Sequence, residues 1–83
     1  MEYGYRIAYT VLNEGTPVVT SDGETIGTVT AIRADFDDDI FDGLVIGTSE
    51  GQRFVEADRI GDLYEHAVVL ELSADEVRSL PTV

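Results

Sequence analysis

The stretch Gly15–Ile60 indicates the fold class, because it alternates short β-branched runs with tight turns. It opens as GTPVVTSDGETIGTVTAI, passes through an aspartate-rich break, and resumes as DGLVIGTSEGQRFVEADRI. The Asp22-Gly23 and Glu50-Gly51 pairs are typical of tight connections between antiparallel strands. The pattern predicts a small, mainly β domain that has little room for catalytic machinery.

The apolar runs on either side of these turns read as short strands. Inside the second strand, the inward-facing set of side chains shifts between Ile26 and Val29, which predicts a β-bulge at Gly27. A bulge there would supply the bend that a small barrel needs. The expected strands are Thr16–Thr20, Thr25–Ala34, Leu44–Thr48, Arg53–Glu56 and a kinked strand from Leu63 to Leu72.

The N-terminal segment places its large side chains on alternate positions, which is the period of a strand with one apolar face. These side chains are Tyr3, Tyr5, Ile7, Tyr9 and Val11. The favoured interpretation is an extra edge strand that covers the barrel. The second is a contact surface formed by Tyr3, Tyr5 and Tyr9, since tyrosine is enriched at interfaces.

The C-terminus carries the signals of a short helix. Ser73 and Glu76 have the spacing of a capping box, and Leu72 and Val77 have that of a hydrophobic staple. Pro81 ends the helix after about two turns, because its ring excludes the preceding residue from the helical conformation. We therefore expect a helix over residues 73–80 that packs on one end of the barrel.

Length and composition limit the classes of function. The 83 residues predict one domain, with a strand extension (1–12), a barrel core (14–72) and the helix (73–80). Seventeen acidic residues against five arginines give a net charge of -12, which disfavours direct binding to nucleic acids or anionic membranes.

No apolar run is long enough for a membrane helix, and no signal-peptide pattern opens the chain. We expect a cytoplasmic protein. Small domains without cysteine often gain stability by association, so a homo-oligomer is also expected.

The order of turns and strands resembles the PRC-barrel family from Glu14 to Leu72. The matching features are Gly15, the apolar pair Val18-Val19, Asp22-Gly23, and Ile26-Gly27 with Val29; a later Val55–Ile60 unit follows. The resemblance implies a compact six-stranded β-barrel. Similar domains occur in the photosynthetic reaction-centre H subunit, in a maturation factor of the small ribosomal subunit, and as stand-alone proteins. Their shared theme is protein contact, and the resemblance supplies no catalytic residue.

The run DFDDDIFDG (35–43) is the most unusual segment of the chain. Its aspartates open with the spacing of an EF-hand, but Ile40 stands where that loop needs Gly, and Ile46 where it needs Glu. The first interpretation is a solvated connection with its apolar side chains partly tucked in. The second is a docking loop for a basic partner, with Phe36 and Phe41 as anchors.

The sequence offers no catalytic constellation. His66 is the only histidine, and neither a nucleophile–base pair, a metal-ligand histidine pair nor a phosphate-binding glycine loop is present. We expect no cofactor and no enzymatic activity. The predicted function is a self-associating protein-interaction or adaptor module. Alternatives are a small-ligand or cation-binding module using Asp35–Asp42, and a ribosome-assembly helper acting through a protein partner.

Overall fold

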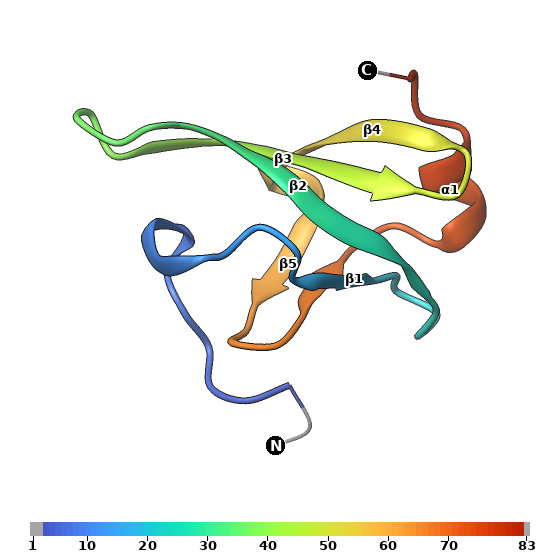
Figure 1. Ribbon diagram of the computed structural model, residues 1–83, viewed down its shortest axis with the longest axis horizontal. Helices are drawn as coiled ribbons and strands as arrows, with labels where there is room; N and C mark the ends of the chain where they lie inside the picture. The colour runs from blue at the N-terminus through green and yellow to red at the C-terminus, as the bar shows by residue number, and fades with distance from the viewer. Residues whose placement is uncertain (1–2, 83) are drawn as a thin grey trace.

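The computed structural model describes residues 3–82, which form mainly β structure (Figure 1). The strands are β1 (Pro17–Val19), β2 (Thr25–Asp35), β3 (Ile40–Thr48), β4 (Gly51–Glu56), β5 (Ile60–Leu63) and β6 (Val68–Leu70). The helix is α1 (Ala74–Arg78), and the 3₁₀ turns are η1 (Tyr9–Val11) and η2 (Ala57–Arg59). The mainly β class predicted from the sequence is confirmed.

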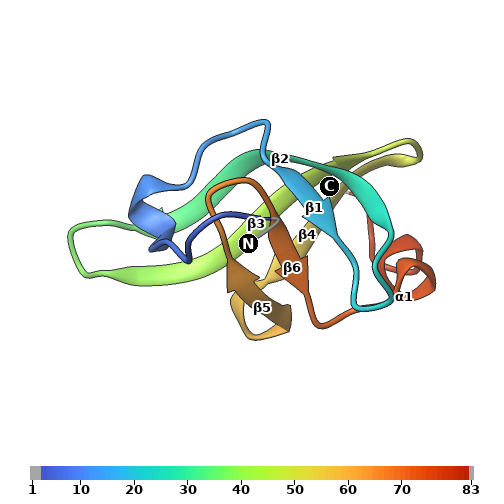
Figure 2. The same ribbon diagram turned by 90° about the horizontal axis from the view of Figure 1, so that it is seen from below.

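The six strands form one curled sheet in the order β4-β3-β2-β1-β6-β5 (Figure 2). The central β1 pairs parallel with β6, and the other neighbours are antiparallel. Within residues 3–82, β4 and β5 are the two edges and do not pair with each other, so the expected barrel is not closed. Each edge meets a terminal segment of the chain instead: Ile7 N donates to Leu63 O (2.9 Å), and Thr82 forms a bridge with Arg53.

A bulge is present where β2 pairs with β1, one residue before the predicted position at Gly27. Val18 pairs with Gly27 but Val19 pairs with Thr25, so Ile26 is the extra residue. Gly27 itself is required by the neighbouring strand, because a Cβ atom there would lie 1.9 Å from the carbonyl oxygen of Gly47. The bulge bends β2, so that this strand reaches from β1 at one end to the long hairpin with β3 at the other.

The core lies inside the curl of the sheet and contains the side chains that alternate inward along the strands. The predicted inward set Val68, Leu70 and Leu72 is fully or almost fully buried. The other buried members of this cluster are Leu12, Val18, Val29, Leu44, Ile46, Val55 and Val77. The apolar alternation that predicted the strands is therefore the pattern that forms the core.

The predicted N-terminal strand is wrong for the residues that the structure describes; Met1 and Glu2 lie outside them. Gly4 has a φ of +81°, Arg6 makes only an isolated bridge with Tyr64, and the chain turns into η1 at Tyr9. These two breaks in the extended backbone prevent the alternate tyrosines from sharing one face. The segment still covers the edge near β5, since Glu65 N donates to Tyr5 O and His66 N to Tyr3 O.

The C-terminal helix and its cap are present, but α1 is shorter than predicted, Ala74–Arg78 instead of residues 73–80. Ser73 is the N-cap and accepts from Glu76 N, while the Glu76 carboxylate accepts from Ser73 N (3.0 Å). Leu72 and Val77 are both buried, and Leu80 packs against the core. Among residues 3–82, no helix has the length and apolar character needed to cross a membrane.

Candidate protein-interaction surface

The β2–β3 hairpin extends beyond the body of the molecule and carries the aspartate-rich run at its tip (Figure 1). The strands continue so far that only residues 36–39 remain as a turn. Asp35 Oδ1 accepts from the backbone N–H groups of Asp37 and Asp38, each at 3.2 Å. Asp39 adopts a φ of 56°, a left-handed conformation that aspartate tolerates better than most residues. The aspartates therefore build the turn as well as charging it.

Three aromatic rings from two distant segments meet beside this tip. Tyr9 stacks on Phe41, with ring centroids 4.9 Å apart and an interplanar angle of 10°. Tyr9 also contacts Phe36 at 5.7 Å in a tilted arrangement. Phe36 remains 57% exposed, whereas Tyr9 and Phe41 are half-buried. This aromatic cluster (Tyr9, Phe36 and Phe41) joins two sets of residues that the sequence pointed to separately.

A hydrogen bond fixes the cluster to the turn. The Tyr9 hydroxyl donates to Asp39 Oδ1 at 2.5 Å. This bond, assisted by partial desolvation and by the negative charges of Asp39 and Asp35, raises the pKa of Tyr9 to about 12. Tyr9 is therefore neutral and held in place over the whole physiological range of pH.

The surroundings of the aromatic cluster are strongly negative. Asp35, Asp37, Asp38, Asp39 and Asp42 all lie in or next to the turn, while Arg33 is the single arginine on the hairpin. Despite this density, no group of three His, Cys, Asp or Glu side chains suited to a metal ion lies within residues 3–82. An exposed aromatic anchor within a negative field is chemically suited to a partner that carries both apolar and basic side chains.

The other two tyrosines of the predicted contact face lie elsewhere. Tyr3 packs against Tyr64 with ring centroids 5.8 Å apart. Tyr5 is 80% exposed, and its backbone N–H donates to Glu65 Oε1 (2.9 Å). The structure therefore brings Tyr9 together with Phe36 and Phe41 but does not bring Tyr3 and Tyr5 into that group.

Comparison with known families identifies the scaffold that carries this surface. A family model described as the PRC-barrel domain matches residues 14–77, which include all six strands. The chain belongs to the PRC-barrel domain family. PRC-barrel domains are small β modules that often take part in protein interactions. No curated protein gives a significant match to the chain.

The family match also separates the shared scaffold from what this PRC-barrel chain adds. Phe36 and Phe41 lie within the matched residues, whereas Tyr9 lies before them. The sequence signalled each of the three aromatics, but nothing in it linked position 9 to positions 36 and 41. That link depends on where the N-terminal segment leaves the edge of the sheet, which only the folded chain reveals.

Proposed function

We propose that this PRC-barrel protein is a non-enzymatic interaction module that docks a basic partner protein on its aromatic cluster. The observation that carries the proposal is the exposed ring of Phe36, which contacts Tyr9 and belongs to a turn with five aspartates in it or next to it. Aromatic side chains that are already held in place lose little conformational entropy on binding and are frequent energetic hot spots.

The net charge supports a basic partner over a second copy of the chain. Two molecules that each carry a charge of -12 repel one another, and pairing their hairpin tips would bring ten aspartates together. A basic protein is attracted by the same field, which raises its association rate and selects it against acidic competitors. The aspartates thus supply steering and specificity, while the aromatic cluster supplies contact area.

Photo-crosslinking in the native host tests this proposal. A benzophenone amino acid replaces Phe36 in one variant and Glu14, an exposed residue outside the hairpin, in a matched control. We expect the Phe36 variant to form adducts with basic proteins. The yield of these adducts should fall after Asp37→Asn and Asp38→Asn. Adducts that are the same from both positions, or that form only between copies of this chain, would show that the proposal is wrong.

Self-association through another surface is the second candidate function. Its support is the highly exposed Tyr5 ring, because tyrosine side chains are enriched at protein interfaces. Light scattering after size exclusion should then show a dimer that Tyr5→Ser weakens. A monomer at every accessible concentration would reject this candidate.

Binding of a cation by Asp35–Asp42 gains no support from the described residues, because Asp35 is engaged in the turn and Asp39 is engaged with Tyr9. A role as a ribosome-assembly helper would use the same aromatic cluster, with a basic ribosomal protein as the partner. The proposed compartment is the cytoplasm, whose reducing conditions suit a chain without cysteine.

A further inference from the structure

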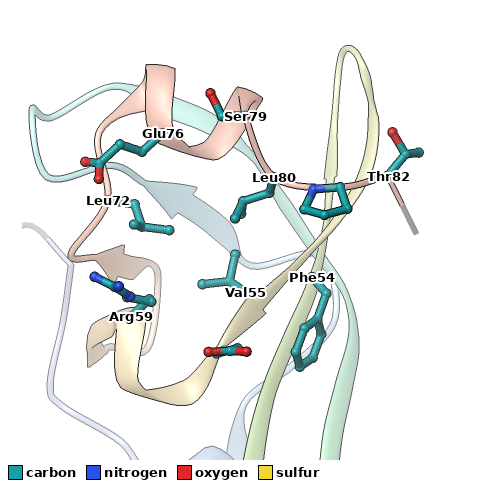
Figure 3. A pocket seen from close by; sticks show the side chains of 10 residues that line it. Phe54, Val55, Arg59, Leu72, Glu76, Ser79, Leu80 and Thr82 are labelled. Carbon is teal, nitrogen blue, oxygen red and sulfur yellow. The ribbon is translucent and has the colours of Figure 1, made fainter.

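A concave surface lies between β4 and the C-terminal end of the described chain. It is a groove of about 680 Å³ between β4, η2, α1 and the segment that follows α1. Figure 3 shows Val55, Leu72 and Leu80 converging on its floor, Phe54 at one side, and Arg59 and Glu76 at the other. We call this surface the β4–α1 groove.

The walls of the groove are held in place by specific contacts. Arg53 is only 6% exposed, and its Nη1 atom donates to Glu50 O, Gln52 O and Thr82 Oγ1, each at 3.2 Å. These bonds fix the segment after Pro81 against the edge of β4. The capping box fixes Glu76 on the opposite wall, and the hydrogen bond from Ser73 N is the main reason why the pKa of Glu76 lies below its usual range. The groove is therefore preformed and carries an ionised carboxylate.

The groove is continuous with a shallow acidic hollow that leads toward the hairpin. The hollow is lined by Phe41, Asp42, Phe54, Glu56, Ala57 and Asp58. It shares Phe54 and Glu56 with the groove, and it shares Phe41 with the aromatic cluster. Its three ionisable side chains are all carboxylates. A shallow acidic path that is also lined by Phe41 and Phe54 thus connects the aromatic cluster to the groove.

The edge position of β4 adds a second mode of recognition. β4 pairs with β3 on one side, and on the other side Thr82 makes an isolated bridge with Arg53 only. An edge strand presents main-chain N–H and C=O groups to which an extended peptide can add. The alternate side chains of such a peptide would point toward the groove floor, and the others toward the carboxylates.

We propose that the β4–α1 groove binds an extended peptide segment with alternating apolar and basic residues. Its apolar side chains contact Phe54, Leu80 and Pro81, the apolar groove residues with accessible surface, and its basic side chains pair with Glu56 and the acidic hollow. This inference deepens the proposed function, on which it rests, by extending the footprint of the basic partner from the hairpin to the edge of the sheet. A second copy of the chain is a poor occupant, because its charge of -12 meets the same carboxylates.

A titration followed by backbone amide chemical shifts tests the groove separately from the aromatic cluster. The probe is the blocked peptide acetyl-Arg-Val-Arg-Leu-Arg-Val-amide, and the control peptide has Glu in place of each Arg. The expected result is saturable shifts at Val55, Glu56 and Leu80 with the basic probe only. Shifts confined to Asp35–Asp42 would overturn the groove proposal and leave the proposed function standing. Shifts confined to the groove would support the groove proposal, and crosslinking through position 36 decides the role of the aromatic cluster separately.

Two variants and one control sharpen the test. Glu56→Gln removes an exposed carboxylate from the rim and should lower the affinity for the basic probe about twofold to fivefold. Leu80→Ser removes half-buried apolar surface and should lower this affinity roughly tenfold. Glu14→Gln changes the net charge equally, lies outside the groove and hollow, and should leave binding within about twofold. Equal losses in Glu56→Gln and Glu14→Gln, or equal binding of the acidic control peptide, would refute recognition by the rim carboxylates.

Discussion

Tyr9 is the residue at which the N-terminal segment and the β2–β3 hairpin meet. Its ring stacks on Phe41 and its hydroxyl donates to Asp39, so one side chain makes both an apolar and a polar contact across about 30 positions of sequence. Such a residue positions its neighbours more than it offers surface itself. The contact with Tyr9 positions the exposed Phe36 ring, on which we propose that a partner docks.

The ionisation of Tyr9 provides a direct readout of this contact. In Asp39→Asn, the charge and the strong acceptor are lost, while asparagine still tolerates the left-handed backbone at this position. The pKa of Tyr9 should fall from about 12 toward the ordinary value of 10, as measured by an ultraviolet titration of tyrosinate. The control, Asp37→Asn, should leave Tyr9 near 12. An unchanged Tyr9 pKa in Asp39→Asn would show that the hydrogen bond does not form.

The sign of the pH dependence follows from the raised pKa. Between the unfolded value of 10 and the folded value of about 12, the unfolded chain has lost the Tyr9 proton and the folded chain has kept it. The stabilisation from this hydrogen bond is therefore complete below pH 10 and disappears as the pH rises through 12. A Tyr9→Phe variant should show a weaker loss of stability over that alkaline window.

Gly27 is a position at which any side chain would collide with the neighbouring strand β3. A Cβ atom would approach the Gly47 carbonyl to 1.9 Å, so Gly27→Ala must separate β2 from β3 or move the bulge. We expect a loss of about 2 kcal/mol in the free energy of unfolding, measured by chemical denaturation. The control is Thr25→Ala, an exposed position in the same strand that should change stability by less than about 0.5 kcal/mol. Similar small effects from both variants would contradict the close approach of the strands.

At the scale of elements, the short helix α1 depends on its cap. Five residues are too few for a helix to be stable by itself, and the reciprocal bonds between Ser73 and Glu76 satisfy two backbone N–H groups at its start. Because the folded pKa of Glu76 lies below its ordinary value of 4.5, the stabilisation by its carboxylate is present above that pH. It is lost as the pH falls through the folded pKa.

Removal of the N-cap side chain tests the importance of α1. Ser73→Ala should lower the free energy of unfolding by about 1 kcal/mol at neutral pH. Ser21→Ala, at an exposed turn position, serves as the control and should have a much smaller effect. Equal stabilities of Ser73→Ala and the unmodified protein would mean that the cap contributes nothing to the helix.

The elements that could be predicted are those whose conformation depends on short-range sequence patterns. The capping box, the bulge in β2 and the inward set of Val68, Leu70 and Leu72 all depend on neighbours within a few positions. The capping box and the inward set are found as predicted, and the bulge lies at Ile26, one residue before the predicted Gly27. The N-terminal segment has an equally regular alternation, but its conformation is set by contacts with Leu63, Glu65 and His66, more than fifty positions away. Those contacts, together with the turn at Gly4, override the strand pattern.

The candidate surface also combines features that local sequence signals predict with features that depend on long-range contacts. The aromatic and acidic residue types were visible in the sequence, so Phe36, Phe41 and Tyr9 could each be named. Their assembly into one cluster could not be predicted, because it depends on the path of the N-terminal segment across the edge of the sheet. The β4–α1 groove was missed for a similar reason: its walls come from β4, η2 and the chain after Pro81, and no single stretch carries its signature.

At the scale of the whole molecule, the dominant property is the charge of -12. Two arginines are engaged in surface ion pairs, Arg6 with Asp62 and Arg78 with Glu24, Glu50 and Asp75, and Arg53 is buried. Most carboxylates therefore repel one another across the surface, and this repulsion opposes the compact state.

Salt should consequently stabilise the fold. Between about 0.01 M and about 1 M sodium chloride the screening length falls from about 30 Å to about 3 Å, so we expect the thermal midpoint to rise. The rise should be smaller in the double variant Asp37→Asn/Asp38→Asn, which removes two charges from the densest region. A thermal midpoint that is independent of salt in both proteins would argue against net repulsion.

Affinity for the basic protein that is crosslinked through position 36 shows whether the aromatic cluster is the docking site. Binding to the unmodified chain is measured against Phe36→Ala, whose side chain is 57% exposed and contributes little to the core. The aromatic cluster predicts at least a tenfold weaker affinity, corresponding to a loss of about 1.4 kcal/mol, with an unchanged unfolding midpoint. Equal affinity of the two proteins for that partner would contradict the claim that the cluster is the docking site.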